Sequence, residues 1–134
     1  MNYRDVVMDH YSNPRNKKRM EDSNYLKQNT KNTSCIDNLD IYCLIDDDII
    51  KDITFDGEAC AISISSASIM TTLLIGKTIN EAKEIINNID NMLNDLDYNK
   101  DLIKEASVYE NVKNTSRKTC AWLPYAGIKK IIEK

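Results

Sequence analysis

Residues 39–55, LDIYCLIDDDIIKDITF, decide the fold of this chain. Every second position from 39 to 45 is apolar, a pattern that is typical of a strand with one buried face. The acidic triplet at 46–48 suits a turn, and the odd-numbered positions from 49 to 55 mark a second strand. The stretch therefore predicts an antiparallel hairpin. One strand carries Leu39, Ile41, Cys43 and Ile45 on one face, and the other carries Ile49, Lys51, Ile53 and Phe55.

Upstream of the hairpin, residues 3–12 predict a short helix with Val6, Val7 and Tyr11 on one apolar stripe. Asn13 ends this helix, because a residue that precedes proline is pushed out of the helical region. The polar residues 13–34 contain only a weak strand signal.

Downstream of the hairpin the sequence predicts four helices. Residues 59–74 form the first, and its small side chains permit close packing. Thr78 and Glu81 make a capping box for the second, whose 3.6-residue apolar stripe runs to about Leu96. The remaining two cover residues 101–112 and a segment from about 120–124 to Ile132, with Pro124 restricted to the first turn.

These elements predict a single domain over residues 1–134, of the α+β class, with a small antiparallel sheet of about three strands covered by helices. The chain is 42% hydrophobic and 29% charged, with a net charge of −3, which argues against nucleic-acid and anionic-membrane partners. It holds no apolar run of the ~18 residues that a membrane span needs, and no signal-peptide pattern. We therefore expect a cytoplasmic protein, in which cysteines are thiols or metal ligands rather than disulfides.

Three of the four cysteines stand where the predicted chain geometry changes. Cys35 precedes the hairpin, Cys60 lies at the junction of a strand and a helix, and Cys120 lies just before the last helix. A helix N-terminus favours the thiolate, and Arg117 acts in the same direction on Cys120. We therefore expect Cys60 and Cys120 to ionise more easily than an ordinary thiol.

Asp37 stands two residues after Cys35, so this loop offers one sulfur and one oxygen to the same ion. Three thiolates and one carboxylate suit four-coordinate zinc, and thiolates also hold iron–sulfur clusters. The residues alone leave a second interpretation open, because the chain has no Cys-x-x-Cys pair and scattered cysteines are often inert core residues. Cys43, on the apolar face of a strand, is interpreted as core, and the single histidine, His10, as a structural or surface residue rather than a ligand.

Three motifs resemble the NifU/IscU-like family of iron–sulfur cluster assembly proteins, and they occur in the order found in that family. They are YRDVVMDHYSNPRN at 3–16, GEACAIS at 57–63 followed by SSAS at 65–68, and RKTCA at 117–121. Two features indicate the SufU-type branch. Thr119 stands where classical IscU scaffolds have histidine, and the interval between Cys60 and Cys120 is long enough for the insertion of that branch.

The resemblance implies a compact SufE/NifU-like fold and a zinc ion held by Cys35, Asp37, Cys60 and Cys120. It implies a pyridoxal-phosphate cysteine desulfurase of the SufS-like kind as partner, with iron–sulfur acceptor or scaffold proteins downstream. Cys35 would accept the persulfide sulfur, and Arg117 would pair with the displaced thiolate.

This chain departs from the family pattern at two positions. Ile36 stands where the family has glycine, and a β-branched side chain is expected to make that loop stiffer. Pro124 interrupts what is usually a run of helix formers.

Three functional hypotheses remain in competition at this point. The leading one is a zinc-dependent sulfurtransferase that accepts sulfur from a desulfurase. The second is a scaffold on which an iron–sulfur cluster is assembled and transferred to apo-proteins. The third is a structural zinc module, which the stiffer loop at Ile36 favours.

Overall fold

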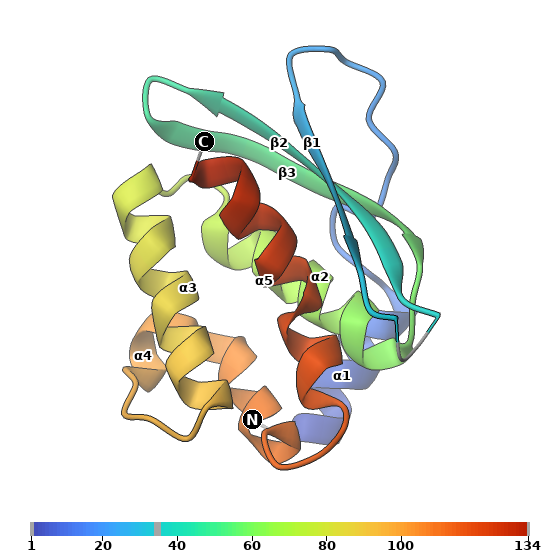
Figure 1. Ribbon diagram of the computed structural model, residues 1–134, viewed down its shortest axis with the longest axis vertical. Helices are drawn as coiled ribbons and strands as arrows, with labels where there is room; N and C mark the ends of the chain where they lie inside the picture. Colours follow the sequence, from blue (N-terminus) through green and yellow to red (C-terminus); the bar gives the residue numbers. More distant parts are fainter. Residues whose placement is uncertain (1, 34–35, 134) are drawn as a thin grey trace.

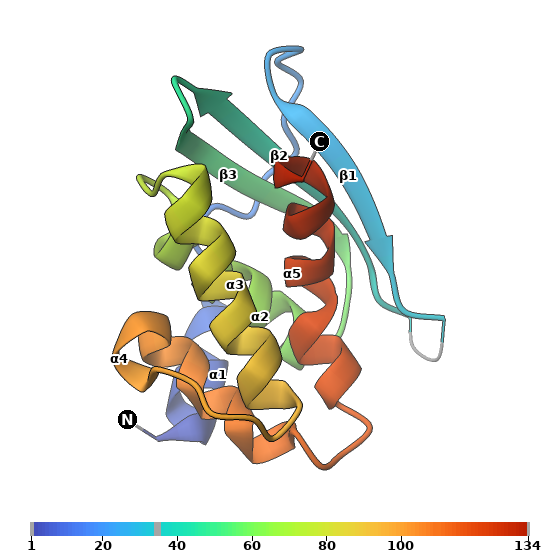
Figure 2. The same cartoon turned by 60° about the vertical axis from the view of Figure 1, so that its left-hand side comes forward.

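The computed structural model describes residues 2–33 and 36–133 of the chain. A three-stranded antiparallel sheet forms one layer, and the helices pack on one of its faces (Figures 1 and 2). The α+β prediction is thus confirmed. The strands follow chain order, β1 (Leu26–Lys31), β2 (Asn38–Asp46) and β3 (Ile49–Glu58). The helices are α1 (Tyr3–Ser12), α2 (Ala61–Leu74), α3 (Ile79–Leu93), α4 (Lys100–Ile103), the 3-10 helix η1 (Lys104–Val112) and α5 (Lys118–Ile132).

The predicted hairpin is β2–β3, but its face pattern changes near the turn. Ile45 pairs with Ile50 and Leu44 with Asp52, so Lys51 is an extra residue opposite the register shift. A bulge of this kind turns the preceding side chains to the other face. Ile50 is therefore fully buried and Lys51 exposed, and the prediction that Ile49 and Lys51 share a face with Ile53 is wrong.

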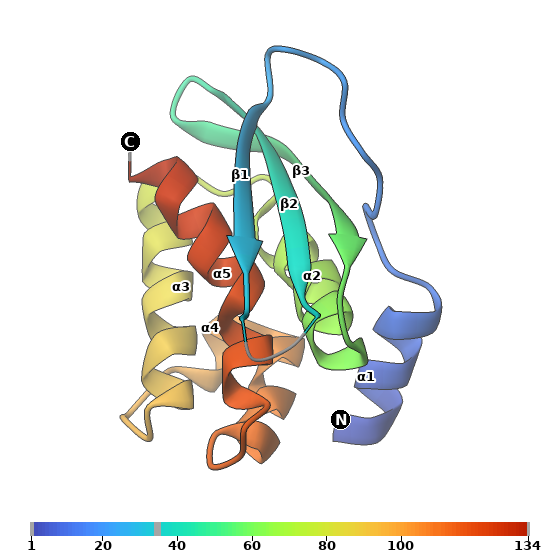
Figure 3. The ribbon, with the colours of Figure 1, turned by 45° about the vertical axis from the view of Figure 1, so that its right-hand side comes forward.

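Helices α2 and α5 cover the sheet, and α3 packs against α5 (Figure 2). Gly127 lets α5 approach strand β2 closely, because a Cβ at this position would lie 2.9 Å from Ile41 Cγ1. Cys43 is fully buried in the core between these layers, as predicted. On the side of β3, residues 13–25 return along the sheet (Figure 3), with a parallel bridge between Lys17 and Phe55.

Helix boundaries confirm some predictions and correct others. The capping box of α3 forms as predicted, with Glu81 N–H bonded to Thr78 Oγ1 and Thr78 N–H bonded to Glu81 Oε1. The helix ends at Leu93, however, and Leu96 is 60% exposed instead of buried. Helix α5 begins at Lys118, so Pro124 stands inside the helix and beyond its first turn.

Candidate metal centre

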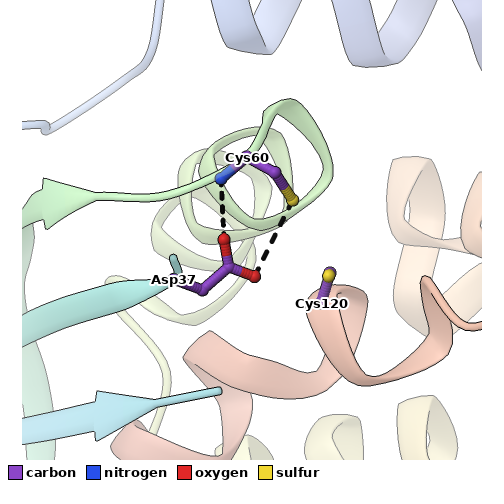
Figure 4. A group of neighbouring side chains, drawn as sticks. All are labelled: Asp37, Cys60 and Cys120. Atoms are coloured by element: carbon purple, nitrogen blue, oxygen red, sulfur yellow. Dashed lines mark hydrogen bonds between the residues drawn. The ribbon is translucent and has the colours of Figure 1, made fainter. Parts of the chain in front are cut away.

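Three predicted ligand residues converge from three separate elements. Asp37 directly precedes β2 and is 2% exposed, Cys60 is the N-cap of α2, and Cys120 is in the first turn of α5 and fully buried. One carboxylate oxygen and the two sulfurs all lie within 4.8 Å of one another. Figure 4 shows the Asp37 carboxylate and both thiols pointing into the same space. Among the described residues, the structure therefore assembles one candidate site from parts that are distant in sequence.

The strand–helix junction before Cys60 depends on a glycine. Gly57 has φ +137°, and a Cβ at this position would lie 2.2 Å from the Asn38 carbonyl oxygen. This close contact lets the end of β3 run beside the start of β2, where Asp37 is. Strand β3 continues through Gly57 to Glu58, three residues beyond the second strand predicted over 49–55.

The Asp37 carboxylate is held by hydrogen bonds at both oxygens. The Cys60 backbone N–H donates to Oδ1 at 2.8 Å, and the Ser63 hydroxyl donates to Oδ2 at 2.8 Å. The Cys60 sulfur lies 3.8 Å from Oδ2. Burial acts to raise the pKa of Asp37, but the hydrogen bonds from Cys60, Ser63 and Cys120 together hold it below the usual carboxyl value. The residue is therefore an ionised carboxylate in a buried setting.

The thiol of Cys120 differs from the expectation of easy ionisation. Burial raises its pKa to about 12, and the adjacent Asp37 carboxylate and Cys60 act in the same direction. The partial charge at the start of α5 does not compensate for these effects. A bound cation would reverse this balance, because a metal displaces the proton of a coordinating thiol.

The described donors fit a thiophilic divalent cation such as zinc. Two sulfurs and one carboxylate oxygen lie within 4.8 Å of one another, and this donor set is one that zinc prefers. Cys35, the fourth predicted ligand, lies outside the described residues. Its neighbour Ile36 has a side chain that is 75% exposed.

Arg117 is exposed at the N-terminal end of α5. Burial raises the pKa of the Tyr3 phenol, the Arg117 charge opposes this effect, and Cys60 adds to it. Arg117 and Cys60 thus both act on the Tyr3 phenol at this end of the molecule.

His10 is not part of the site. It is 1% exposed and bonded to Ser68 and Glu105, which confirms a structural role.

A surface groove of about 430 Å³ lies next to the site. It is lined by Ala59, which precedes Cys60, and by Tyr11 and Ile36, whose side chains are 46% and 75% exposed. Tyr11 therefore faces this groove rather than the core stripe predicted from residues 3–12.

The comparisons with known proteins agree with this geometry. Residues 2–119 match the family described as the NifU-like N terminal domain. The chain belongs to this family. It is 35% identical to the "Zinc-dependent sulfurtransferase SufU" of Bacillus subtilis over 134 residues, which cover 98% of this chain and 90% of that protein. It is 26% identical over 135 residues to the "Iron-sulfur cluster assembly scaffold protein IscU" of Thermotoga maritima, covering 100% of this chain and 94% of that protein.

Solved structures show the same likeness. A putative iron–sulfur cluster assembly scaffold protein for the SUF system from Fervidobacterium islandicum superposes with a TM-score of 0.88 at 31% identity, covering 93% of this chain and 92% of that one. A NifU-like protein from Brucella abortus reaches a TM-score of 0.86 at 17% identity, covering 96% of this chain and 90% of that one, which shows the shared fold. Within the described residues, every helix is too short or too polar to cross a bilayer.

Proposed function

We propose that this protein is a zinc-dependent sulfur acceptor for a cysteine desulfurase, working in iron–sulfur cluster assembly in the cytoplasm. The observation that carries the proposal is the convergence of Asp37, Cys60 and Cys120 within 4.8 Å at the meeting point of three elements. The 35% identity to a zinc-dependent sulfurtransferase over 98% of this chain supports it.

In this proposal Asp37, Cys60 and Cys120 hold the ion, together with Cys35 as fourth ligand. Zinc, when bound, supplies charge that keeps the thiols deprotonated at neutral pH. Cys35 is the acceptor, because it belongs to the loop whose next residue, Ile36, is exposed to a partner. The Cys35 thiolate attacks the terminal sulfur of the desulfurase persulfide. The S–S bond of the donor breaks, a new S–S bond forms on Cys35, and the donor cysteine leaves as a thiolate.

The groove beside Ala59 is the proposed contact surface for the desulfurase, of the SufS-like type. It is lined by the chain neighbours of Asp37 and Cys60, and it exposes two large apolar side chains, Tyr11 and Ile36, which is typical of an interaction surface. A loop that carries the persulfide cysteine would reach the site along this groove. Downstream, an iron–sulfur scaffold or acceptor protein would take the sulfur.

The test is desulfurase turnover with free cysteine in the presence of the zinc-loaded protein. We expect the wild-type protein to raise the turnover rate, and mass spectrometry to find the extra sulfur on Cys35. Arg117→Ala should lower the stimulation of desulfurase turnover while zinc stays bound. The proposed role of Arg117 is to pair with the Cys35 thiolate when that thiolate is displaced from the zinc ion. Lys118→Ala is the matched control, since the Lys118 ammonium is bonded to Asn94 Oδ1 instead. A zinc-loaded protein that neither stimulates turnover nor gains sulfur would refute sulfur transfer and leave a structural zinc module.

The scaffold function is the second candidate, and the relation to the Thermotoga scaffold over the whole chain favours it. Anaerobic reconstitution with iron and sulfide tests it. A scaffold would form a coloured cluster and transfer it to an apo-ferredoxin. Thr119 in place of the histidine of classical scaffolds, and Arg117, support the sulfur-acceptor function instead.

A further inference from the structure

The Ser63 hydroxyl lies beside all three described ligand residues. Its hydroxyl oxygen lies 2.8 Å from Asp37 Oδ2, 3.1 Å from the Cys120 carbonyl oxygen and 3.7 Å from the Cys60 sulfur. The residue is fully buried in the first turn of α2, three positions after Cys60. A buried hydroxyl with this set of neighbours is placed to control how the ligands are oriented.

The hydroxyl has a single proton and two acceptors within reach. The carboxylate is ionised and closer, so it is the stronger acceptor in the structure described. The second acceptor is available because of Pro124. In a regular helix the N–H of residue 124 would bond to the carbonyl of residue 120, and proline has no N–H to donate.

We propose that Ser63 is a positioning residue of the metal centre, whose hydroxyl holds Asp37 with Oδ2 turned toward the two thiols. The inference rests on the proposed function only in assuming that the three residues bind a metal ion. Without the Ser63 hydroxyl, the carboxylate keeps the Cys60 N–H at Oδ1 but loses the hydroxyl donor at Oδ2. The second oxygen would then no longer be held at a fixed position relative to the sulfurs.

Ser66 provides a matched control on the same helix. It is also fully buried, and its hydroxyl donates to the Ala121 carbonyl oxygen in the first turn of α5 at 2.6 Å. Both hydroxyls therefore lie against a carbonyl at the start of α5, but the Ser66 hydroxyl bonds to backbone and not to a ligand side chain. A difference between the two alanine variants isolates the effect on Asp37 from the effect on helix packing.

The experiment measures zinc affinity of the full chain by competition with a chromophoric chelator. Ser63→Ala should weaken zinc binding by about 10–100-fold, the usual loss when an outer partner of a metal ligand is removed. Ser66→Ala should change the zinc affinity by less than about threefold, since it leaves the hydrogen bonds to the Asp37 carboxylate in place. Cobalt(II) substituted for zinc gives a second readout, because the visible spectrum should shift in Ser63→Ala and stay unchanged in Ser66→Ala.

An equal loss of affinity in both variants, or an unchanged cobalt spectrum in Ser63→Ala, would overturn the proposal. If Ser63→Ala does not fold, Ser63→Thr and Ser63→Val settle the question, because these side chains have the same shape and differ in the hydroxyl. Threonine should bind zinc more tightly than valine, and equal affinities would refute a role for the hydroxyl. A wild-type protein that binds no zinc would refute the proposed metal centre itself. This result differs from a failure of the Ser63 proposal alone, in which the wild type binds zinc and the variants do not differ.

Discussion

The three proposed ligand residues differ in how far the protein prepares each one for a cation. Asp37 is ionised and held at both oxygens, whereas the Cys120 thiol is buried beside that carboxylate and retains its proton. Cys60 is partly exposed at the N-cap of α2. The metal-free site therefore has one fixed anion and thiols of unequal accessibility, and the cation completes the charge balance.

This inequality predicts the order in which the thiols react. In the metal-free protein, Cys60 should be alkylated by iodoacetamide much faster than Cys120 at pH 7–9. Cys120 is fully buried and its pKa is about 12, so its reactive thiolate stays rare until the pH approaches that value. Peptide mapping by mass spectrometry measures both rates. Equal labelling of the two cysteines at pH 8 would contradict the account, and zinc should protect both.

Tyr25 allows a pH test away from the site. A 2.6 Å hydrogen bond to Asp52 Oδ2 raises the pKa of its phenol to about 12. Because the folded pKa lies above the ordinary value of 10.0, this bond contributes its full stability below pH 10 and loses it as the pH rises toward 12. Tyr25→Phe should therefore cost about 0.5–1.5 kcal/mol at pH 7.

The loss of stability caused by Tyr25→Phe should shrink between pH 10 and 12. Urea unfolding at several pH values will show this change. Ultraviolet titration near 295 nm should count one late-ionising phenol fewer in Tyr25→Phe than in the wild type, in which burial also raises the pKa of other tyrosines. A constant difference in stability across this range would show that the hydrogen bond does not cause the effect.

At the scale of elements, α5 is a helix with proline in its interior. Pro124 removes one helical hydrogen bond, which leaves the Cys120 carbonyl oxygen without its usual helical donor and 3.1 Å from the Ser63 hydroxyl. Pro124→Ala restores the N–H and should raise the free energy of unfolding by about 1–3 kcal/mol, since proline in a helix interior costs up to ~3 kcal/mol. Urea denaturation of the metal-free protein measures this change. A loss of stability would mean that the proline fits the helix better than its missing hydrogen bond indicates.

Helices α1 and α2 and the 3-10 helix η1 meet at His10. The Arg15 backbone N–H donates to Ser68 Oγ, and the same oxygen lies 2.7 Å from His10 Nδ1. On the other side of the ring, His10 Nε2 lies 3.2 Å from Glu105 Oε1. Both ring nitrogens of this buried imidazole are therefore hydrogen-bonded.

His10→Ala should cost about 2–3 kcal/mol, because it leaves a cavity and a buried Ser68 hydroxyl without its imidazole partner. Met8→Ala, on the same helix but 52% exposed, should cost less than about 0.5 kcal/mol. Thermal unfolding of both variants measures the difference. Similar costs would show that the contact of α1 with η1 is not held by His10.

Elements with a local signal could be predicted from the sequence. The alternation in 39–45 and the capping box at Thr78 specify β2 and the start of α3 through near neighbours alone. The errors occurred where tertiary contacts decide. Strand β1 has few apolar residues and exists because it pairs with β2, and the bulge at Lys51 is a property of the pair. Leu96 fits the apolar period of α3, yet the helix ends three residues earlier.

At the scale of the whole molecule, the site results from topology. Asp37, Cys60 and Cys120 are far apart in sequence, and spacing alone left inert core cysteines as an open interpretation. They meet because the start of β2, the N-cap of α2 and the first turn of α5 lie together (Figures 1 and 4). The family resemblance predicted these residues, whereas Ser63 was missed. Its only signal was a polar residue three positions after Cys60 on a buried helix.

The central claim is that these three residues form a zinc centre, and zinc analysis of the freshly purified protein tests it most directly. We predict one zinc per chain without visible colour. Cys60→Ser and Cys120→Ser should each lose most of the zinc, and Cys43→Ala should keep it, because Cys43 is buried in the core away from the site. Zinc that is absent from the wild type, or that survives in both serine variants, would contradict the account.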